Sequence, residues 1–395
     1  MNRHSPFRRV SAALALALAV ALTQTACDKG TSGGSGGGSS GGDKIKIGHL
    51  ASLTGNEATF GQSCEKGIQI ALEETNKAGG ILGKQIELIT VDDQSKNQEV
   101  NNCMVKLTQK DQVCAVIGEI ASSNTMAAAP EAQSSKIPLV TPGSTNPLVT
   151  QKGDYIFRIC YTDDYQGRAI AGFAAKRLGL KRAVTMTDQS SAYSLSLTQE
   201  FKKVFEKEGG QVLLDVSYKK TDNEYNAQIN QALAAKPDVL VLTGYYTNVP
   251  NIIQTARKAG FTGACVGGDG WDSDELYKMG GKALDDCYFT NHYSPDDTDP
   301  RIQEFINKFK AKHNGAVPDA MAVLGYDAAM VVFDAIKRAG VAEGPKIRDA
   351  LAQTTGFKGV SGDITMDANR NAKDKKIMIV GVKDGKQFLK EPWKG

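Results

Sequence analysis

The chain has 395 residues, with 47 Lys and Arg against 44 Asp and Glu, and a formal net charge of +3. No stretch combines dense Lys and Arg with interleaved aromatic residues, so we expect no nucleic-acid partner. The length allows two domains, each with its own buried core.

The first 26 residues have the organisation of an export signal. Arg3, Arg8 and Arg9 precede an Ala- and Leu-rich run that is too short to span a bilayer comfortably. Cleavage after residue 26 would lower the formal net charge from +3 to 0, because this segment holds three arginines and no acid. We therefore predict that residues 1–26 are a signal peptide and that the mature protein lies in the periplasm or at the cell surface.

Cys27 follows the small residues Thr25 and Ala26 and precedes a stretch of almost pure Gly and Ser. Such a stretch cannot bury a core and forms a flexible tether, which is useful if the cysteine at its start is anchored. We predict that Cys27 is lipidated, that residues 27–43 are the tether, and that the membrane is reached through the lipid. Gln24 stands where lipoprotein signals usually have Leu, so cleavage to a soluble secreted protein remains the alternative.

From residue 44 onward, apolar strand-like runs alternate with amphipathic helices. Strands are predicted at 44–51, 84–93, 113–120, 136–142, 183–188, 211–218, 238–244, 264–269 and 286–293. Helices are predicted at 64–78, 100–109, 165–178, 195–208, 225–235, 249–259, 301–312, 320–339 and 346–352, with strands at 363–367 and 376–389 last. This alternation predicts an α/β fold with two doubly wound parallel-sheet lobes, which bind ligands at the carboxyl ends of their strands.

Residues 118–150 contain the same sequence motif twice: a short apolar strand followed by a Ser/Thr pair that is predicted to begin a helix. Ser122-Ser123-Asn124-Thr125 follows the first strand, and Ser144-Thr145-Asn146-Pro147 follows the second. Ser, Thr and Asn cap helix N-termini, and Pro is favoured in the first turn. Because a helix N-terminus binds anions, two of them at neighbouring strands predict one anion-sized pocket.

Several longer blocks carry a family resemblance: GEIASSNTMAAAP, TPGSTNPLVTQKGDYIFRICYTDDYQG, LTGYYTNVP, GGDGWDS and NHYSPDDTDPRIQEF. They resemble the branched-chain amino-acid (Leu/Ile/Val) binding proteins, the periplasmic substrate-binding proteins of ABC importers. The resemblance implies a type I periplasmic binding fold whose lobes are joined by a hinge of three crossings, near residues 160–164, 292–295 and 357–362. Lobe one would then comprise residues 44–162 and 294–360, and lobe two residues 163–293 and 361–395.

The same resemblance assigns the polar ends of an amino-acid site. Ser122 and Thr145 would bind the ligand carboxylate, with Ser123 as a further donor. The Ser144 backbone carbonyl and the Thr145 hydroxyl would face the ammonium, and Asp269 would approach the same group from lobe two. A zwitterion needs both of its charges paired when it is desolvated.

The remaining site residues are expected at the hinge and on an apolar wall. Asp163 is a second candidate for the ammonium, although an Asp after a strand is otherwise a turn or cap residue. Phe60 and Tyr245 match family aromatics that contact the ligand side chain. Trp271 and Tyr326 are further candidates, and packing alone would also explain them.

Six cysteines follow Cys27, and export suggests an oxidising compartment. They are Cys64, Cys103, Cys114, Cys160, Cys265 and Cys287. Six cysteines allow 15 pairings, which sequence cannot resolve. Their places in the predicted elements favour Cys103 with Cys114 and Cys265 with Cys287. No CxxC or Cys/His cluster occurs, so we expect no metal site.

The sequence offers no convincing enzyme signature. GGILGKQ lacks the spacing and the Ser/Thr of a phosphate-binding loop, and no serine has the context of a nucleophile elbow. We expect no catalytic residues and no cofactor. The hypothesis is a monomeric solute-binding receptor that closes on a free amino acid, with Leu, Ile or Val leading, and is recognised by a membrane ABC permease. The alternatives are a short-chain amide, urea or an aromatic acid as ligand, or a ligand sensor for a signalling partner.

Overall fold

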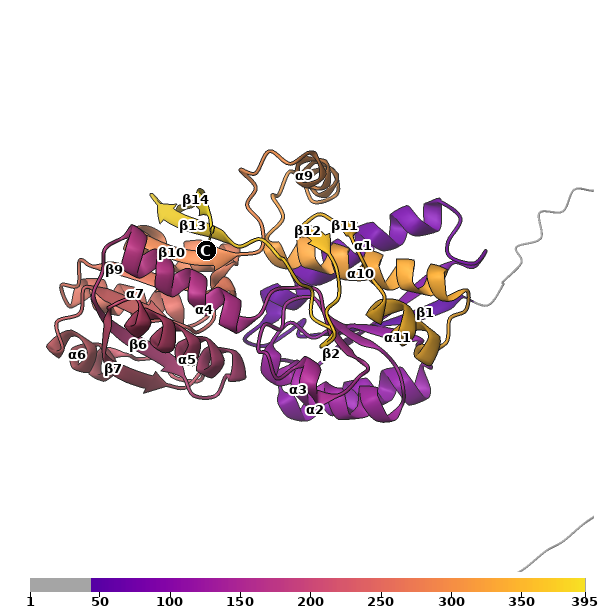
Figure 1. Cartoon of the computed structure of the whole chain (residues 1–395), viewed down its shortest axis with the longest axis horizontal. Coiled ribbons are helices and arrows are strands. Elements are labelled where there is room, and N and C mark those ends of the chain that lie inside the picture. Colours follow the sequence, from indigo (N-terminus) through magenta and orange to yellow (C-terminus); the bar gives the residue numbers. More distant parts are fainter. Residues whose placement is uncertain (1–43, 395) are drawn as a thin grey trace, which may run out of the picture. The chain divides into compact units, whose positions relative to one another are not determined.

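The computed structural model describes residues 44–394 (Figure 1). The predicted signal peptide, Cys27 and the Gly/Ser tether lie outside these residues. The described part of the chain has two lobes, each built on its own sheet with flanking helices. The predicted α/β fold is confirmed.

Lobe one is built on a five-stranded sheet in the order β2-β1-β3-β4-β5, with every pair parallel. Its strands are β1 (Ile45–Ala51), β2 (Ile86–Asp92), β3 (Ala115–Gly118), β4 (Leu139–Thr141) and β5 (Ile156–Arg158). Its helices are α1 (Ala58–Lys77), α2 (Asn97–Val105), α3 (Ser122–Ser134), α9 (Pro300–Lys312), α10 (Ala320–Ala339) and α11 (Gly344–Ala352), with the shorter turns η1 (Lys106–Lys110) and η2 (Thr150–Lys152). A small antiparallel ribbon of β11 (Phe357–Gly359) and β12 (Gly362–Ile364) contacts α10.

Lobe two is built on a seven-stranded sheet in the order β14-β13-β10-β9-β8-β6-β7. Its strands are β6 (Arg182–Asp188), β7 (Gln211–Tyr218), β8 (Val239–Leu242), β9 (Ala264–Gly267), β10 (Cys287–Asn291), β13 (Met378–Lys383) and β14 (Lys386–Pro392). Its helices are α4 (Asp163–Gly172), α5 (Ala192–Lys207), α6 (Asn226–Ala234), α7 (Val249–Lys258) and α8 (Asp274–Gly280), with turns η3 (Phe173–Arg177), η4 (Asp269–Trp271) and η5 (Gly281–Leu284). The strands β6 to β10 pair in parallel, whereas β13 and β14 add an antiparallel edge.

The inner strands are apolar on both faces because helices cover both faces of a parallel sheet. Every residue of β3 (AVIG) and of β8 (VLVL) is buried. These continuous apolar runs explain why the strands could be predicted from sequence. The polar residues that follow them therefore mark the carboxyl edge of each sheet.

Helix α10 packs closely on α1 and thereby returns the second half of the chain to lobe one. Two glycines allow this approach. A Cβ on Gly67 would lie 1.9 Å from the carbonyl oxygen of Ala322, and a Cβ on Gly325 would lie 2.4 Å from that of Cys64. Any larger residue at either position would push the two helices apart.

The chain passes between the lobes three times, and the third passage differs from the expectation. The first two passages follow β5 and β10. The segment after residue 360 stays with lobe one, because Asn371 bridges to Arg158 of β5 and Ala372 bonds the same strand. The third passage therefore lies between Ala372 and β13, about a dozen residues later than expected.

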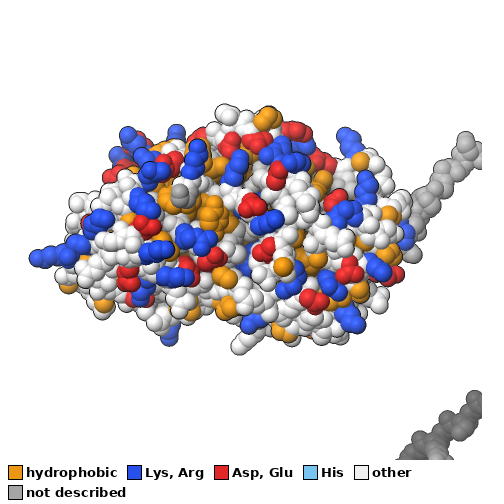
Figure 2. Space-filling view, viewed as in Figure 1, with side chains coloured by type: hydrophobic (Ala, Val, Ile, Leu, Met, Phe, Trp, Pro, Cys, Tyr) orange, Lys and Arg blue, Asp and Glu red, His pale blue; other side chains and the backbone are white. Residues whose placement is uncertain are grey.

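Lys and Arg side chains are intermingled with Asp and Glu over the face shown in Figure 2. Within residues 44–394, no helix combines the length and the hydropathy needed to cross a membrane.

Candidate ligand-binding site

A small cavity lies where the two lobes meet, at the carboxyl ends of their strands. Its lining comes from both lobes and consists of Phe60, Ile120, Ser122, Gly143, Thr145 and Met321 with Tyr193, Tyr245, Asp269 and Gly270. The space in it that a water molecule could occupy is only about 10 Å³, so the two lobes lie close together around these residues.

Hydrogen bonds between the lobes surround this cavity. The Thr59 N–H donates to the Tyr246 hydroxyl at 3.2 Å. The Ala192 N–H donates to the Ser123 hydroxyl oxygen at 3.0 Å, and the Asn146 side-chain amide donates to the Ala192 carbonyl at 2.8 Å. These contacts hold lobe two against lobe one, so a molecule in the cavity would be enclosed by both lobes.

Helix α3 supplies one polar end of the cavity. It begins at Ser122, and the preceding residue Ala121 has no side chain that could cap the helix. The N–H groups of the first turn have no intrahelical partners, and the helix end carries a partial positive charge. The Ser122 hydroxyl oxygen accepts the Asn146 N–H at 3.2 Å, so its own proton can be donated into the cavity. This end is suited to a carboxylate.

The prediction of a second helix N-terminus at Ser144-Thr145-Asn146-Pro147 is wrong. After β4 the chain forms turns, and only the short turn η2 follows. Pro147 disfavours a helical conformation for the residue before it. The buried Arg158 guanidinium also donates to the carbonyls of Ser144 at 2.8 Å, Asn146 at 2.9 Å and Pro147 at 3.3 Å. These are the acceptors that a first helical turn would need, so Arg158 keeps the loop irregular.

The side chain of Ser144 therefore stabilises this loop by hydrogen bonds within lobe one. Its hydroxyl contacts the Glu119 carbonyl at 3.1 Å, the Ile120 carbonyl at 2.9 Å and the Thr125 hydroxyl at 2.6 Å. Its own carbonyl accepts from Arg158, which occupies the group expected to face an ammonium. Thr145, by contrast, lines the cavity beside Gly143.

Asp269 supplies the opposite polar end, from lobe two. It follows β9 at the start of η4, and its side chain is only 4% exposed. One carboxylate oxygen, Oδ2, lies 2.8 Å from His292 Nε2, while Oδ1 has no hydrogen-bond partner among the described residues. A buried carboxylate oxygen without a partner is costly unless a ligand donor pairs with it.

His292 is a site residue that the sequence analysis missed. It is fully buried, and burial lowers the pKa of its imidazole, so the neutral ring donates to the Asp269 carboxylate. It belongs to the block NHYSPDDTDPRIQEF, but the predicted strand 286–293 placed it inside a strand, whereas β10 ends one residue before it, at Asn291. Polar residues at the carboxyl end of a parallel strand are candidates for the site by position alone.

Asp163 lies behind the cavity wall. It is the first residue of α4, it is fully buried, and its N–H donates to the Thr145 carbonyl at 2.9 Å. Burial raises the pKa of Asp163 to about 7, and the nearby charge of Asp269 adds to this effect. Asp163 therefore supports Thr145 and is set back from the cavity itself.

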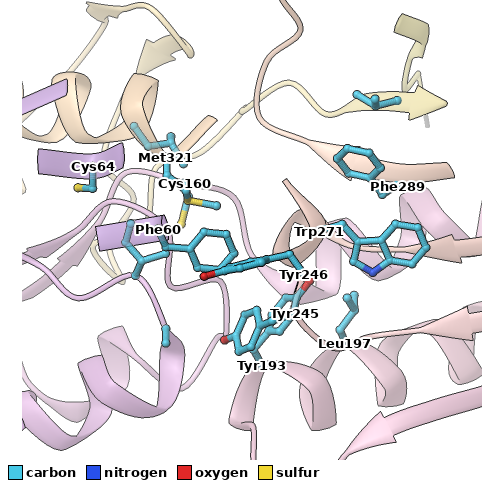
Figure 3. Close-up of a cluster of buried hydrophobic side chains, with 14 of the residues drawn as sticks. Phe60, Cys64, Cys160, Tyr193, Leu197, Tyr245, Tyr246, Trp271, Phe289 and Met321 are labelled. Atoms are coloured by element: carbon cyan, nitrogen blue, oxygen red, sulfur yellow. The ribbon is translucent and has the colours of Figure 1, made fainter. Parts of the chain in front are cut away.

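The remaining wall is aromatic and apolar (Figure 3). Phe60 from lobe one packs edge-on against Tyr245 and Tyr246 from lobe two, with ring centroids 5.8 and 4.8 Å apart. Tyr245 stacks on Tyr193 at 5.2 Å, and Met321 of α10 extends the apolar lining. This wall suits an aliphatic or aromatic group.

Two predicted wall residues lie elsewhere. Trp271 is buried in the core of lobe two, where its indole N–H donates to the Leu242 carbonyl at 3.1 Å and its ring packs on Phe289, away from Phe60 (Figure 3). Tyr326 packs on Phe305 and donates to Glu74 at 2.8 Å, on the α9 side of lobe one. Both are packing residues, because a large ring that follows a strand or lies on a helix can be buried without reaching the cavity.

The six cysteines in the described part of the chain are free thiols. The favoured pair Cys103 and Cys114 is not joined, and Cys103 Sγ instead contacts the Asp92 carbonyl. Cys265 and Cys287 lie directly opposite each other on β9 and β10 and are also unlinked. In residues 44–394, no group of His, Cys, Asp and Glu has an arrangement that could hold a metal ion.

Two α/β lobes that enclose a small cavity between a helix N-terminus and a buried carboxylate define a type I solute-binding protein. The periplasmic binding protein family matches residues 44–387, and the chain belongs to this family.

Three of the similar proteins are named for the amino acids that they bind or transport. The leucine-, isoleucine-, valine-, threonine-, and alanine-binding protein of Pseudomonas aeruginosa is 28% identical over 334 residues, which cover 84% of this chain and 88% of the relative. A crystal structure of a leucine binding protein from Thermotoga maritima is 40% identical with a TM-score of 0.85, covering 88% of this chain and 98% of that one. The branched-chain amino acid transporter substrate binding protein LivJ from Streptococcus pneumoniae, solved with isoleucine, is 30% identical with a TM-score of 0.83, covering 89% and 99%.

Proposed function

We propose that this protein is the extracytoplasmic solute-binding receptor of an ABC importer and that its ligand is a free amino acid, with Leu, Ile or Val leading. The observation that carries the proposal is the pairing of opposite charges across one small cavity. The α3 N-terminus with Ser122 would bind the ligand carboxylate, and Oδ1 of Asp269, which has no partner within residues 44–394, would bind the ammonium. The relatives named for branched-chain amino acids support the same ligand class.

The cavity also favours a particular kind of side chain. Phe60, Tyr245, Ile120 and Met321 provide apolar surface beside the two polar ends. Burying an aliphatic side chain on such a wall contributes about 1.5–3 kcal/mol. Among residues 44–394, no charged side chain other than Asp269 lines the cavity, so the ionised side chain of a ligand would be desolvated without a partner from these residues.

The alternative ligands fit less well. An aromatic acid has no donor for Oδ1 of Asp269, and a neutral amide has an N–H donor but no positive charge, so neither ligand supplies a counter-charge to this buried carboxylate. An unsatisfied buried polar group costs about 1–3 kcal/mol, and more when it is charged. The sensor hypothesis uses the same site and differs only in the partner that recognises the closed form.

The proposed transport role requires one further partner, a membrane permease. Lobe one would hold the ligand while the hinge is open, and closure would add the contacts of lobe two. A monomer in this closed form would then be recognised by a membrane permease. We assign it no catalytic step, because receptors of this kind release their ligand unchanged.

We further propose that the mature chain is anchored through a lipid on Cys27. The support is the small-residue approach to Cys27 and the Gly/Ser tether that follows it. Wild-type protein should partition into the detergent phase of a detergent phase separation, and Cys27→Ser should remain in the aqueous phase. Equal partitioning of both proteins into the aqueous phase would remove the anchor from the proposal.

The experiment that tests the ligand class is direct identification. Protein purified without added ligand is denatured, and the released small molecules are identified by mass spectrometry. Titration calorimetry with leucine, isoleucine, valine, benzoate and acetamide then ranks them. Tight binding of benzoate or acetamide with no binding of any amino acid would overturn the proposal.

A further inference from the structure

His292 connects the ligand cavity to the hinge. It lies immediately after β10, at the start of the second passage between the lobes, and its side chain is fully buried. Its Nε2 atom lies 2.8 Å from Oδ2 of Asp269, which itself lines the cavity. The hydrogen bond between His292 and Asp269 therefore connects the cavity directly to a hinge segment.

The bond to His292 fixes which carboxylate oxygen faces the ligand. Because Oδ2 accepts from His292, the carboxylate cannot rotate freely, and Oδ1 is the oxygen that finds no partner within residues 44–394. The ring that holds Oδ2 is neutral, since burial lowers the pKa of His292. A neutral ring brings no positive charge of its own next to the Asp269 carboxylate.

The other two passages approach the same imidazole. Tyr161, on the first passage, stacks on His292 with ring centroids 3.9 Å apart and planes 18° apart. Lys375, on the third passage, lies close enough that its positive charge further lowers the pKa of His292, and its ammonium donates to Ser361 at 2.7 Å. The charged groups that face His292 are thus Asp269 and Lys375, with the Tyr161 ring across its face.

We infer that His292 is a positioning residue that makes Asp269 selective for an ammonium group and links that contact to the hinge. This inference rests on the proposed amino-acid ligand. Since Tyr161 and His292 lie on different passages, rotation of one lobe against the other moves the two rings relative to each other. We therefore expect the stack to change with the hinge angle, and with it the position of the ring that holds Oδ2 of Asp269.

Two substitutions separate the hydrogen bond from the ring. His292→Phe keeps an aromatic ring for Tyr161 and removes the donor, whereas His292→Gln keeps an N–H donor for Asp269. His313→Phe is the matched control, because His313 also packs on an aromatic ring, at 4.3 Å from Phe309, but lies after α9. Full-length proteins are compared by thermal unfolding and by calorimetry with leucine and with 4-methylpentanoate, which is leucine without its amino group.

Loss of the donor should weaken leucine binding selectively. His292→Phe should bind leucine about tenfold or more weakly, the loss typical of a hydrogen bond to a charged group. Its affinity for 4-methylpentanoate should change much less, His292→Gln should recover most of the leucine affinity, and His313→Phe should match wild type. Parallel losses for both ligands would indicate a merely structural role and overturn the inference, as would an unchanged leucine affinity in His292→Phe.

A measurement on wild type keeps the inference testable if His292→Phe does not fold. Magnetic resonance of isotope-labelled histidine, with the His292 signal assigned by its loss in His292→Gln, reports the protonation state of the ring. The inference requires a neutral ring protonated on Nε2 at neutral pH with leucine bound, and an imidazolium overturns it. If Asp269→Asn loses leucine while His292→Phe does not, the proposed function stands and only this inference fails; if wild type binds no amino acid, both fail.

Discussion

Replacing Asp269 with Asn removes one negative charge from the cavity and changes almost nothing else. The side chain keeps its size, and its oxygen can still accept from His292, 2.8 Å away in the native protein. The lost feature is the charge on Oδ1, the buried oxygen that has no hydrogen-bond partner in the described part of the chain. A leucine ammonium would then be buried without its counter-charge.

The expected cost follows from the burial of this group. Truncating one partner of a buried, hydrogen-bonded charge pair costs on the order of 2–5 kcal/mol. Since about 1.4 kcal/mol is a tenfold change in affinity, Asp269→Asn should bind leucine about 30-fold to 4,000-fold more weakly. Exposed ion pairs contribute little free energy, but the Asp269 side chain is only 4% exposed, so we expect the larger cost of a buried pair.

Titration calorimetry with two ligands tests this prediction. Leucine should lose affinity in Asp269→Asn, whereas 4-methylpentanoate, which binds wild type poorly, should lose little or gain. Asp274→Asn is the matched control, because Asp274 is an exposed acid five residues along the chain in α8. Leucine binding by Asp269→Asn within about threefold of wild type, less than half of one tenfold step, would refute the assignment of this oxygen to the ammonium.

Three further predictions concern the other end of the cavity, the hinge and a buried acid. Ser122→Ala removes a hydroxyl donor to a charged acceptor and should cost leucine binding about 1.5–3 kcal/mol by calorimetry; an unchanged affinity would contradict the carboxylate site. Saturating leucine should reduce the radius of gyration in small-angle scattering, and an unchanged curve would count against closure. Burial raises the pKa of Glu119 from 4.5 to about 8, so wild type should lose stability relative to Glu119→Gln as the pH rises from about 5 to about 8. Urea unfolding of both proteins at the two pH values measures this, and a constant difference would contradict it.

The sign of the Glu119 prediction follows from where its proton is bound. Glu119 is fully buried and accepts the Ser52 N–H at 2.9 Å and the Ala121 N–H at 2.7 Å. The folded protein retains the proton above the pH at which the unfolded chain releases it, so rising pH favours unfolding across this interval. Glutamine does not titrate in this pH range, so Glu119→Gln should not show this loss of stability.

The sequence by itself determined the elements whose signals are local. The helix α10 matches the predicted range 320–339, since apolar residues recur at helical spacing between Asp319 and Gly340. The apolar strands ending before Ser122, Tyr245 and Asp269 were also predictable, because parallel strands buried on both faces leave continuous apolar runs. Polar residues just beyond such strands then identify the edge where ligands bind.

The tertiary structure decided everything that depends on groups distant in sequence. Local signals at 144–147 favoured a helix, and Arg158 overrides them by taking three carbonyls of that segment. His292 reaches Asp269 because β9 and β10 are neighbours in the sheet, although 23 residues separate the pair. Trp271 follows the same strand as Asp269 and points into the core instead of the cavity. Secondary-structure propensity depends on a few neighbouring residues. The contacts described here depend instead on which strands become neighbours in the sheet, and that order is set only when the whole chain folds.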